Sequence, residues 1–404
     1  MNRTTAVVIA ALVAVLAAIG LLSGEADEAA APGEPPAQRV EPLAQRVEPV
    51  AQRVERLREL KFEHLPRVRR VTGEQARGAA LRELDREIPR ADVLAEERLL
   101  KLLELIPPES SLRELLGEAI GSEVGGYYLP RTGTLSIVGG GGQLGLLGEV
   151  TLAHELTHAL EDQHFGLESR GSTGFRRDRA MADSALREGT ATVAMVDYAV
   201  LQQAGKAKIP ARLRARALRQ LDDVAVPAST GLPRYMREGL VFPYAAGAQL
   251  VNRIQGRGGW KAVNRAFGAG APVSSEQVMH PHKYDARERP VPVRVRGGRG
   301  ALPPDARLVE EGAFGEFDTA QLLREANGRA RSGQAAAGWG GAAFALWRLS
   351  GGECEEPCRE RYALVLRWAW DRERDAHEFE RAARRTARAL SGASVTRRGQ
   401  AVAL

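Results

Sequence analysis

The chain of 404 residues has little cysteine and almost no net charge for its length. Two cysteines cannot build a disulfide-rich scaffold or a four-cysteine zinc module. The 57 basic and 51 acidic residues leave a formal net charge of +6, with acidic residues interspersed nearly everywhere. Because a nucleic-acid-binding surface needs clustered basic residues, we expect no nucleic-acid partner. The hydrophobic share of 44% also excludes a wholly disordered chain and a polytopic membrane protein.

Long hydrophobic runs are equally scarce, and the one present lies close to the N-terminus. Residues Ala6 to Leu22 form an uncharged apolar run that follows Arg3 and precedes Glu25. This charge polarity predicts that the N-terminus stays in the cytoplasm while the rest of the chain is exported. The run is short for a spanning helix and long for a signal-peptide core, so residues 1–24 are interpreted as a signal peptide or an N-terminal membrane anchor. We therefore expect an extracytoplasmic protein, either secreted or anchored to the cell membrane.

A short repeat follows this run. The sequence Ala-Gln-Arg-Val-Glu begins at Ala37, Ala44 and Ala51, with a period of 7. Heptad spacing is typical of a helix, but Pro42 and Pro49 lie inside the repeat and would interrupt one. Residues 25–55 are therefore predicted to form an extended, proline-rich linker.

The remaining sequence predicts an α+β fold that is mostly helical. Capping-box spacing at Thr72–Gln75 and Ser111–Glu114 marks helix starts within residues 56–120, which we interpret as an N-terminal subdomain or a pro-segment. A β-hairpin is expected at 124–128 and 134–138, before the catalytic core helices of residues 121–290. Residues 291–404 are expected to form a mixed C-terminal subdomain. Further predicted elements are helices at 146–163, 178–203, 243–255, 260–267 and 375–390 and strands at 342–347 and 362–370.

The segment His154-Glu155-Leu156-Thr157-His158 carries the clearest chemistry. Two histidines four positions apart share one face of a helix, so both imidazoles can bind a single ion. Glu155 stands beside them and can take a proton from water at the metal. The pattern predicts one Zn²⁺ per chain held by His154 and His158, with Glu155 as general base.

A catalytic zinc site needs a third protein ligand, and two residues compete for this role. His164 has the spacing of the H-E-x-x-H-x-x-G-x-x-H pattern, but Glu161 stands where that pattern requires a helix-breaking glycine. Glu188 lies on the next predicted long helix, with apolar neighbours, and a carboxylate on a second helix is the gluzincin arrangement. The sequence favours Glu188. His164 is then expected to cap the end of the helix or to contact a residue that binds the metal. Asp162, four positions beyond His158, either accepts the free ring N–H of a ligand histidine or is an ordinary solvated carboxylate.

Several stretches resemble a bacterial group of gluzincin-like zinc metallopeptidases, most of them uncharacterised. The resemblance covers about residues 55 to 400. It is carried by HELTHALEDQHF at 154–165, VGGYY at 124–128, LREGTA at 186–191, FPYAAG at 242–247, SSEQVMHPHKY at 274–284 and GWGG at 338–341. It implies a zincin-like peptidase domain. The group usually has an acidic residue at position 190, Glu at 282 and Asp at 342, where this chain has Thr190, His282 and Ala342.

Other residues are candidates for substrate contacts. His280 precedes Pro281, which would hold it extended at a cleft, so His280 and Tyr284 are candidates to stabilise the oxyanion and bind substrate. The alternative is a loop packed by its own aromatic residue and proline. Tyr128 lies in the predicted hairpin and is a further candidate to bind substrate. We expect strand 134–138 to be an edge strand that pairs with an extended peptide.

These features predict an exported zinc metalloendopeptidase that acts on protein or peptide substrates. The alternative is a non-enzymatic cell-envelope binding domain with a structural or vestigial metal site, which a fourth protein ligand would signal. A zinc hydrolase of other amides is a weaker third reading. Cys354 and Cys358 would form a small disulfide loop in an exported protein, with free thiols as the alternative.

Overall fold

The computed structural model describes residues 43–122, 125–138, 146–167, 178–205, 209–219, 231–295, 302–349, 361–390 and 392–404. They form an α+β fold that is mostly helical, as predicted, with one three-stranded and one five-stranded sheet. The apolar run 6–22, the four glycines 139–142, and Cys354 and Cys358 lie outside the described residues. No helix within the described ranges is long and apolar enough to cross a membrane.

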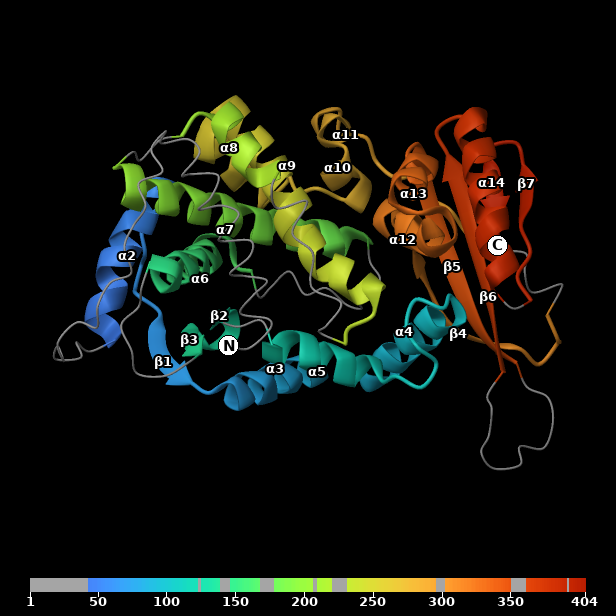
Figure 1. Cartoon of the computed structure of the whole chain (residues 1–404), viewed down its shortest axis with the longest axis horizontal. Helices are drawn as coiled ribbons and strands as arrows, with labels where there is room; N and C mark the ends of the chain where they lie inside the picture. Colours follow the sequence, from blue (N-terminus) through green and yellow to red (C-terminus); the bar gives the residue numbers. More distant parts are fainter. Residues whose placement is uncertain are drawn as a thin grey trace, which may run out of the picture. The chain divides into compact units, whose positions relative to one another are not determined.

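The chain divides into two units, each built from separate stretches of sequence. The first unit contains Met1–Leu84, Leu115–Gly171 and Ser184–Ala271, and the second contains Asp85–Glu114, Ser172–Asp183 and Pro272–Leu404. The predicted domains, in contrast, are continuous in sequence. The elements that lie mainly in the first unit (Figure 1) are α2 (Leu43–Arg58), β1 (Arg67–Val71), α3 (Gly73–Glu87), α5 (Leu112–Ser122), β2 (Gly126–Leu129), η1 (Pro130–Thr132), β3 (Thr134–Val138), α6 (Leu146–Phe165), α7 (Asp178–Ala204), α8 (Ala211–Arg219) and α9 (Arg234–Ala266).

Helix α2 corrects the prediction of an extended linker over residues 25–55, which is wrong from residue 43 onward. The repeat places apolar residues at helical spacing, and they are buried: Val47, Val50, Ala51, Val54 and Leu57. This face packs against α6. Pro49 removes one backbone hydrogen bond inside the helix. Burying the apolar stripe offsets that loss, because each buried aliphatic side chain contributes about 1.5–3 kcal/mol.

The small sheet has the strand order β1-β3-β2. The predicted hairpin is confirmed: β2 pairs antiparallel with β3, with Tyr128 opposite Leu135. The expected edge position of 134–138 is wrong, because β1 pairs with β3 in parallel on its other side. The sequence Arg-Val-Arg-Arg-Val of β1 gave no clear strand pattern, so this partner was not predicted. Strand β2 is therefore an edge strand, and it contacts α6.

Helices α6, α7 and α9 supply much of the buried core of the first unit. Helix α9 joins the two helices predicted at 243–255 and 260–267, which are separated by non-helical backbone at Gly258 and Gly259. It also starts earlier than predicted, so Pro243 lies inside the helix and not at its first turn. The backbones of α7 and α9 meet at glycines: a Cβ added to Gly247 would lie 2.0 Å from the carbonyl oxygen of Ala185.

The second unit is built around the larger sheet, whose strand order is β4-β5-β6-β8-β7. The predicted strands correspond to β5 and β6, and the predicted C-terminal helix to α14, whose Phe379 packs on Trp368 and Trp370 of β6. Strands β4, β7 and β8 were not predicted. The elements are α4 (Arg90–Leu102), α10 (Ser275–Met279), α11 (Pro281–Asp285), β4 (Arg307–Ala313), α12 (Glu316–Asn327), α13 (Arg329–Ala336), β5 (Trp339–Leu349), β6 (Arg361–Trp370), α14 (Glu373–Ala389), β7 (Thr396–Arg398) and β8 (Ala401–Ala403).

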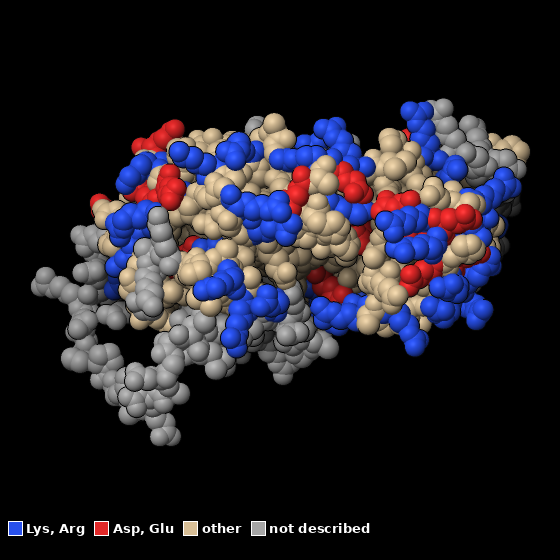
Figure 2. All heavy atoms as spheres, turned by 90° about the horizontal axis from the view of Figure 1, so that it is seen from above, with Lys and Arg blue, Asp and Glu red and all other residues tan. Residues whose placement is uncertain are grey.

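Charges of both signs are distributed over the surface. Figure 2 shows basic and acidic side chains interspersed on the face in view. On α14, for example, Arg384 pairs with Glu380 at 2.7 Å, one turn away. Pairs between solvent-exposed charges contribute little to stability.

Candidate metal centre

Two histidines of helix α6 point their ring nitrogens toward each other on one face of the helix. His154 and His158 are one turn apart, and their Nε2 atoms lie 3.1 Å from each other. The rest of the helix is anchored by buried apolar residues on several sides: Val150, Leu152, Ala153, Leu156, Ala159 and Leu160. Because these residues fix the helix in the core, the two imidazoles are held on a rigid element.

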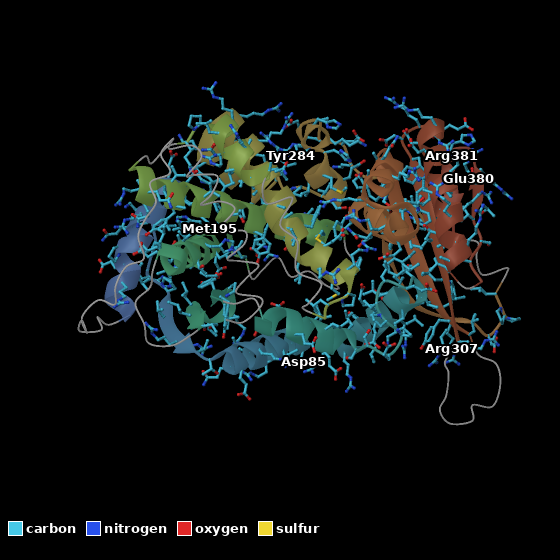
Figure 3. The ribbon with its side chains drawn as sticks, viewed as in Figure 1. Asp85, Met195, Tyr284, Arg307, Glu380 and Arg381 are labelled. Carbon is cyan, nitrogen blue, oxygen red and sulfur yellow. The ribbon has the colours of Figure 1, made fainter. Side chains whose placement is uncertain are left out.

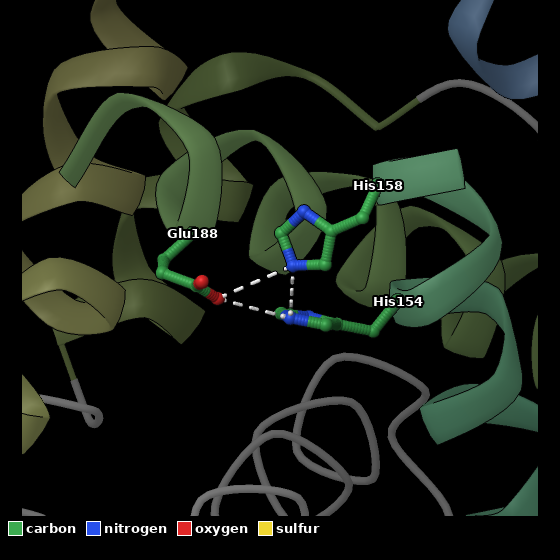
Figure 4. A group of neighbouring side chains, drawn as sticks. All are labelled: His154, His158 and Glu188. Carbon is green, nitrogen blue, oxygen red and sulfur yellow. Dashed lines mark hydrogen bonds and ion pairs between the residues drawn. The ribbon is translucent and has the colours of Figure 1, made fainter. Parts of the chain in front are cut away.

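Glu188 of α7 completes the group. Its Oε2 lies 3.2 Å from Nε2 of His154 and 3.4 Å from Nε2 of His158. Figure 4 shows the three side chains pointing toward one another from their two helices. The side chain of Glu188 is 23% exposed, so the group is reached from solvent. The structure therefore brings together the three residues predicted as ligands.

The spacing of these donor atoms fits a zinc ion. Zinc bonds to nitrogen and oxygen are about 2.0–2.2 Å long, so two ligands of a tetrahedral ion stand about 3.3 Å apart. The three separations in this group are 3.1, 3.2 and 3.4 Å. Two imidazoles and one carboxylate are also a donor set that catalytic zinc sites use with three protein ligands.

The electrostatics of the group favour a cation at its centre. Burial opposes ionisation of Glu188, but the neighbouring His158 and His154 outweigh it and hold the pKa of Glu188 well below its usual range. Burial also lowers the pKa of His158, yet Glu188 more than compensates and raises this pKa to about 9. A positive charge between these side chains is therefore stabilised, and a metal ion competes with a proton for that position.

Glu155, the predicted general base, is held by the edge strand β2. The backbone N–H of Tyr128 donates a hydrogen bond of 3.0 Å to Oε2 of Glu155. Gly126 of the same strand also lies beside the glutamate, because a Cβ there would be in ordinary van der Waals contact with Cγ of Glu155, at 3.5 Å. Burial raises the pKa of Glu155 above its usual value. A carboxylate with a raised pKa and one fixed oxygen suits proton transfer near neutral pH.

Two predicted supporting residues have other contacts. Asp162 does not bind a ligand histidine: its Oδ2 accepts from the hydroxyl of Tyr128 at 3.0 Å, and its Oδ1 accepts from the N–H of Leu167. The side chain of Asp162 therefore binds the end of its own helix and the hairpin, and not a ligand histidine. His164 is not in the metal group either, because its Nε2 contacts the carbonyl of Lys61 at 2.8 Å. Helix α6 continues unbroken to Phe165, so the structure favours Glu188 over His164 as third ligand.

Glu161, at the position where the competing pattern needs glycine, has a structural partner. Its Oε1 lies 3.1 Å from Nη2 of Arg58, and both side chains are fully buried. The guanidinium of Arg58 also stacks over Trp260 at 4.2 Å and donates to Asn264. This contact joins α2 to the C-terminal half of the histidine-bearing helix. Residues 43–55 of α2 were predicted to be a linker, so the packing of this helix against α6, and with it the contact of Arg58, was not expected.

His280 and Tyr284 lie in the second unit, where Figure 3 labels Tyr284 on α11. The predicted loop is a pair of short helices, α10 and α11, with Pro281 at the first turn of the second. Nε2 of His280 lies 2.8 Å from Oε1 of the buried Glu316, which raises the pKa of His280. Tyr284 is buried beneath the guanidinium of Arg287. Their roles toward an oxyanion and a substrate stay predictions, as does the role of Tyr128 in binding substrate.

A second acidic group in the same unit does not need a metal. Glu276, Glu288 and Asp371 converge, and the ammonium of Lys283 lies 2.5–2.7 Å from all three. The ammonium therefore occupies the position that a cation would take.

Tyr244 of α9 is a neighbour of the metal group that had no predicted role. Its ring is stacked on that of His154, with centroids 5.8 Å apart and planes 20° apart. The sequence signal was the stretch FPYAAG at 242–247, which contributed to the family resemblance without a function for its tyrosine.

Comparison with known proteins assigns no activity. A family model described as a domain of unknown function (DUF8575) matches residues 306–403, the C-terminal part of the second unit. No curated protein and no solved structure matches the chain. The matched residues exclude His154, His158 and Glu188, so the metal group is judged on its own geometry.

Proposed function

We propose that the chain is an exported zinc-dependent metallopeptidase of gluzincin type. His154, His158 and Glu188 would hold one Zn²⁺, and Glu155 would act as the general base. The observation that carries this proposal is the convergence of three donor atoms, from two helices, at the separations that tetrahedral zinc requires.

The roles of the residues follow from their positions. When bound, Zn²⁺ acts as a Lewis acid, which polarises a carbonyl and makes water reactive at neutral pH. Glu155 would take a proton from the attacking water and pass it to the leaving amine as the peptide bond breaks, so its carboxylate must alternate between the ionised and the protonated state. The N–H of Tyr128 fixes one oxygen of this carboxylate, which leaves the other free to carry the proton.

The edge strand β2 supports a peptide substrate over a small amide. It contacts the helix that bears the histidines, and its outer side is not paired within the described part of the chain. An extended peptide can add to such an edge through backbone hydrogen bonds. Export is supported by the charge polarity around Ala6–Leu22, and the same segment would anchor the protein if it is not removed.

The test is peptide hydrolysis in ¹⁸O-labelled water. The full zinc-loaded chain is incubated with a diverse peptide mixture, and new termini are read by mass spectrometry. We expect labelled termini with the wild type, none above background with Glu155→Gln, and wild-type activity with the matched control His164→Ala. A wild type that carries one zinc and yields no labelled termini would contradict the proposal and support a non-enzymatic binding domain. Equal activity in Glu155→Gln would contradict the role of Glu155.

A further inference from the structure

Helix α9 provides none of the three metal-binding residues, yet it contacts both helices that do. It crosses α7 (Figure 1) with the backbones touching, because a Cβ on Gly189 would lie 2.3 Å from the carbonyl carbon of Gly247. Gly189 directly follows Glu188. The crossing therefore holds the backbone of the third ligand against α9.

The second contact of α9 is the stack of Tyr244 on His154. Tyr244 precedes Gly247 by three positions, so the two residues lie on the same side of the helix. The ring planes of Tyr244 and His154 are 20° apart, and Tyr244 remains 40% exposed while His154 is buried. One face of the histidine ring is thus covered by the tyrosine ring.

The described part of the chain offers the His154 ring no partner for its second nitrogen, which is the usual means of fixing an imidazole at a metal. A ligand histidine normally donates its second ring N–H to a carboxylate or carbonyl, which sets the ring plane. Within the described residues, both polar contacts of the His154 ring, to Glu188 and His158, use Nε2. Rotation of the ring about its Cβ–Cγ bond is therefore limited by packing. The edge of the His158 ring, with its centroid 4.8 Å away, and the stacked ring of Tyr244 supply that packing.

We propose that Tyr244 is a positioning residue of the metal site, which fixes the plane of the His154 ring so that its Nε2 points at the ion. This inference rests on the proposed zinc function. It assigns the effect to the aromatic ring and not to the hydroxyl group. Removal of the ring should therefore weaken metal binding, whereas removal of the hydroxyl should not.

The experiment is a Co²⁺ titration of the full chain, followed by visible absorption and by competition with a chelator. It compares the wild type with Tyr244→Phe, Tyr244→Leu and Tyr244→Ala. The control Tyr362→Ala removes a partly buried tyrosine from the second unit, and thermal unfolding verifies that each variant is folded. The absorption spectrum reports ligand geometry, which a loss of stability alone would not change.

The expected result is that Tyr244→Phe and Tyr362→Ala keep the wild-type affinity and spectrum. Tyr244→Ala and Tyr244→Leu should bind Co²⁺ about 10- to 100-fold more weakly, as other losses of supporting residues do, with a changed spectrum. Wild-type affinity and spectrum in Tyr244→Ala would overturn the inference and leave the zinc proposal intact. An equal loss in Tyr244→Phe would also overturn it. A wild type that binds no Co²⁺ would overturn the zinc proposal as well.

Discussion

The carboxylate of Glu188 lies 3.2 Å from Nε2 of His154, although the two residues are 34 positions apart and stand on different helices. Like His158, both are largely buried, and a buried carboxylate needs a positive charge beside it, from a proton on an imidazole or from a metal ion. A protein retains such a group where a cation balances it.

The buried ion pair between Arg58 and Glu161 should stabilise the fold only while both partners are present, so removing one partner should cost more than removing both. Arg58→Met leaves the Glu161 carboxylate buried without its partner, which costs about 3–5 kcal/mol of unfolding free energy. The double variant Arg58→Met/Glu161→Leu should recover most of that loss, because no buried charge remains. Urea denaturation measures all three proteins.

The exposed pair of Arg113 and Asp85 provides the matched control. Arg113→Met should lower the unfolding free energy far less than Arg58→Met does, since solvent screens this exposed pair. If Arg58→Met were as mild as Arg113→Met, the pair would not anchor α2 to α6.

The glycine at the crossing of α7 and α9 should not tolerate a side chain. Gly247→Ala places a methyl group against the carbonyl of Ala185, and we expect a loss of about 1–3 kcal/mol together with weaker metal binding. Gly239→Ala on the same helix meets no atom within 4 Å and should stabilise the protein by about 0.5–1 kcal/mol. Thermal and urea unfolding compare the two variants, and similar stabilities would show that the crossing is not tight.

The buried carboxyl of Asp178 predicts a pH-dependent stability in the second unit. Burial raises its pKa to about 7, and a hydrogen bond from Ser275 only partly offsets this. The folded state therefore binds a proton that the unfolded state releases near pH 4, so stability falls as the pH rises from about 4 to about 7. Asp178→Asn removes the ionisable group and with it this contribution to the pH dependence of stability.

The measurement is the difference in unfolding free energy between Asp178→Asn and wild type as a function of pH. The difference should grow in favour of the variant by up to about 4 kcal/mol between pH 4 and pH 8. Asp85→Asn is the control: Arg113 lowers the pKa of Asp85, so the difference for this variant should change mainly below pH 4 and stay nearly constant between pH 4 and pH 8. A difference for Asp178→Asn that does not change with pH would show that the carboxyl ionises normally in the folded state.

The sequence pattern of a single helix, α6, was sufficient to predict the parts of the site that lie on that helix. The i, i+4 spacing of His154 and His158 specifies a shared helix face, and the absence of glycine at Glu161 indicated that α6 continues past His164. Both features follow from helix geometry. Glu188 was favoured as third ligand because it lies among apolar residues on the next predicted helix. The structure places its carboxylate beside the two histidines.

Other features depend on tertiary contacts that no local pattern contains. Pro49 argued against a helix, but packing of the valine stripe on α6 outweighs the lost hydrogen bond. Asp162 has the right spacing to reach His158, yet Tyr128 and Leu167 take both of its oxygens. The stack of Tyr244 on His154 requires the close crossing of α7 and α9, which only the folded chain displays.

Zinc content of the purified full chain tests the central claim most directly. Elemental analysis of the wild type should give one zinc per chain, which Glu188→Ala loses and which His164→Ala and Glu155→Gln keep. Loss of zinc in His164→Ala but not in Glu188→Ala would contradict the assignment of the third ligand. A wild type without zinc, purified under conditions that retain metal, would contradict the metallopeptidase itself.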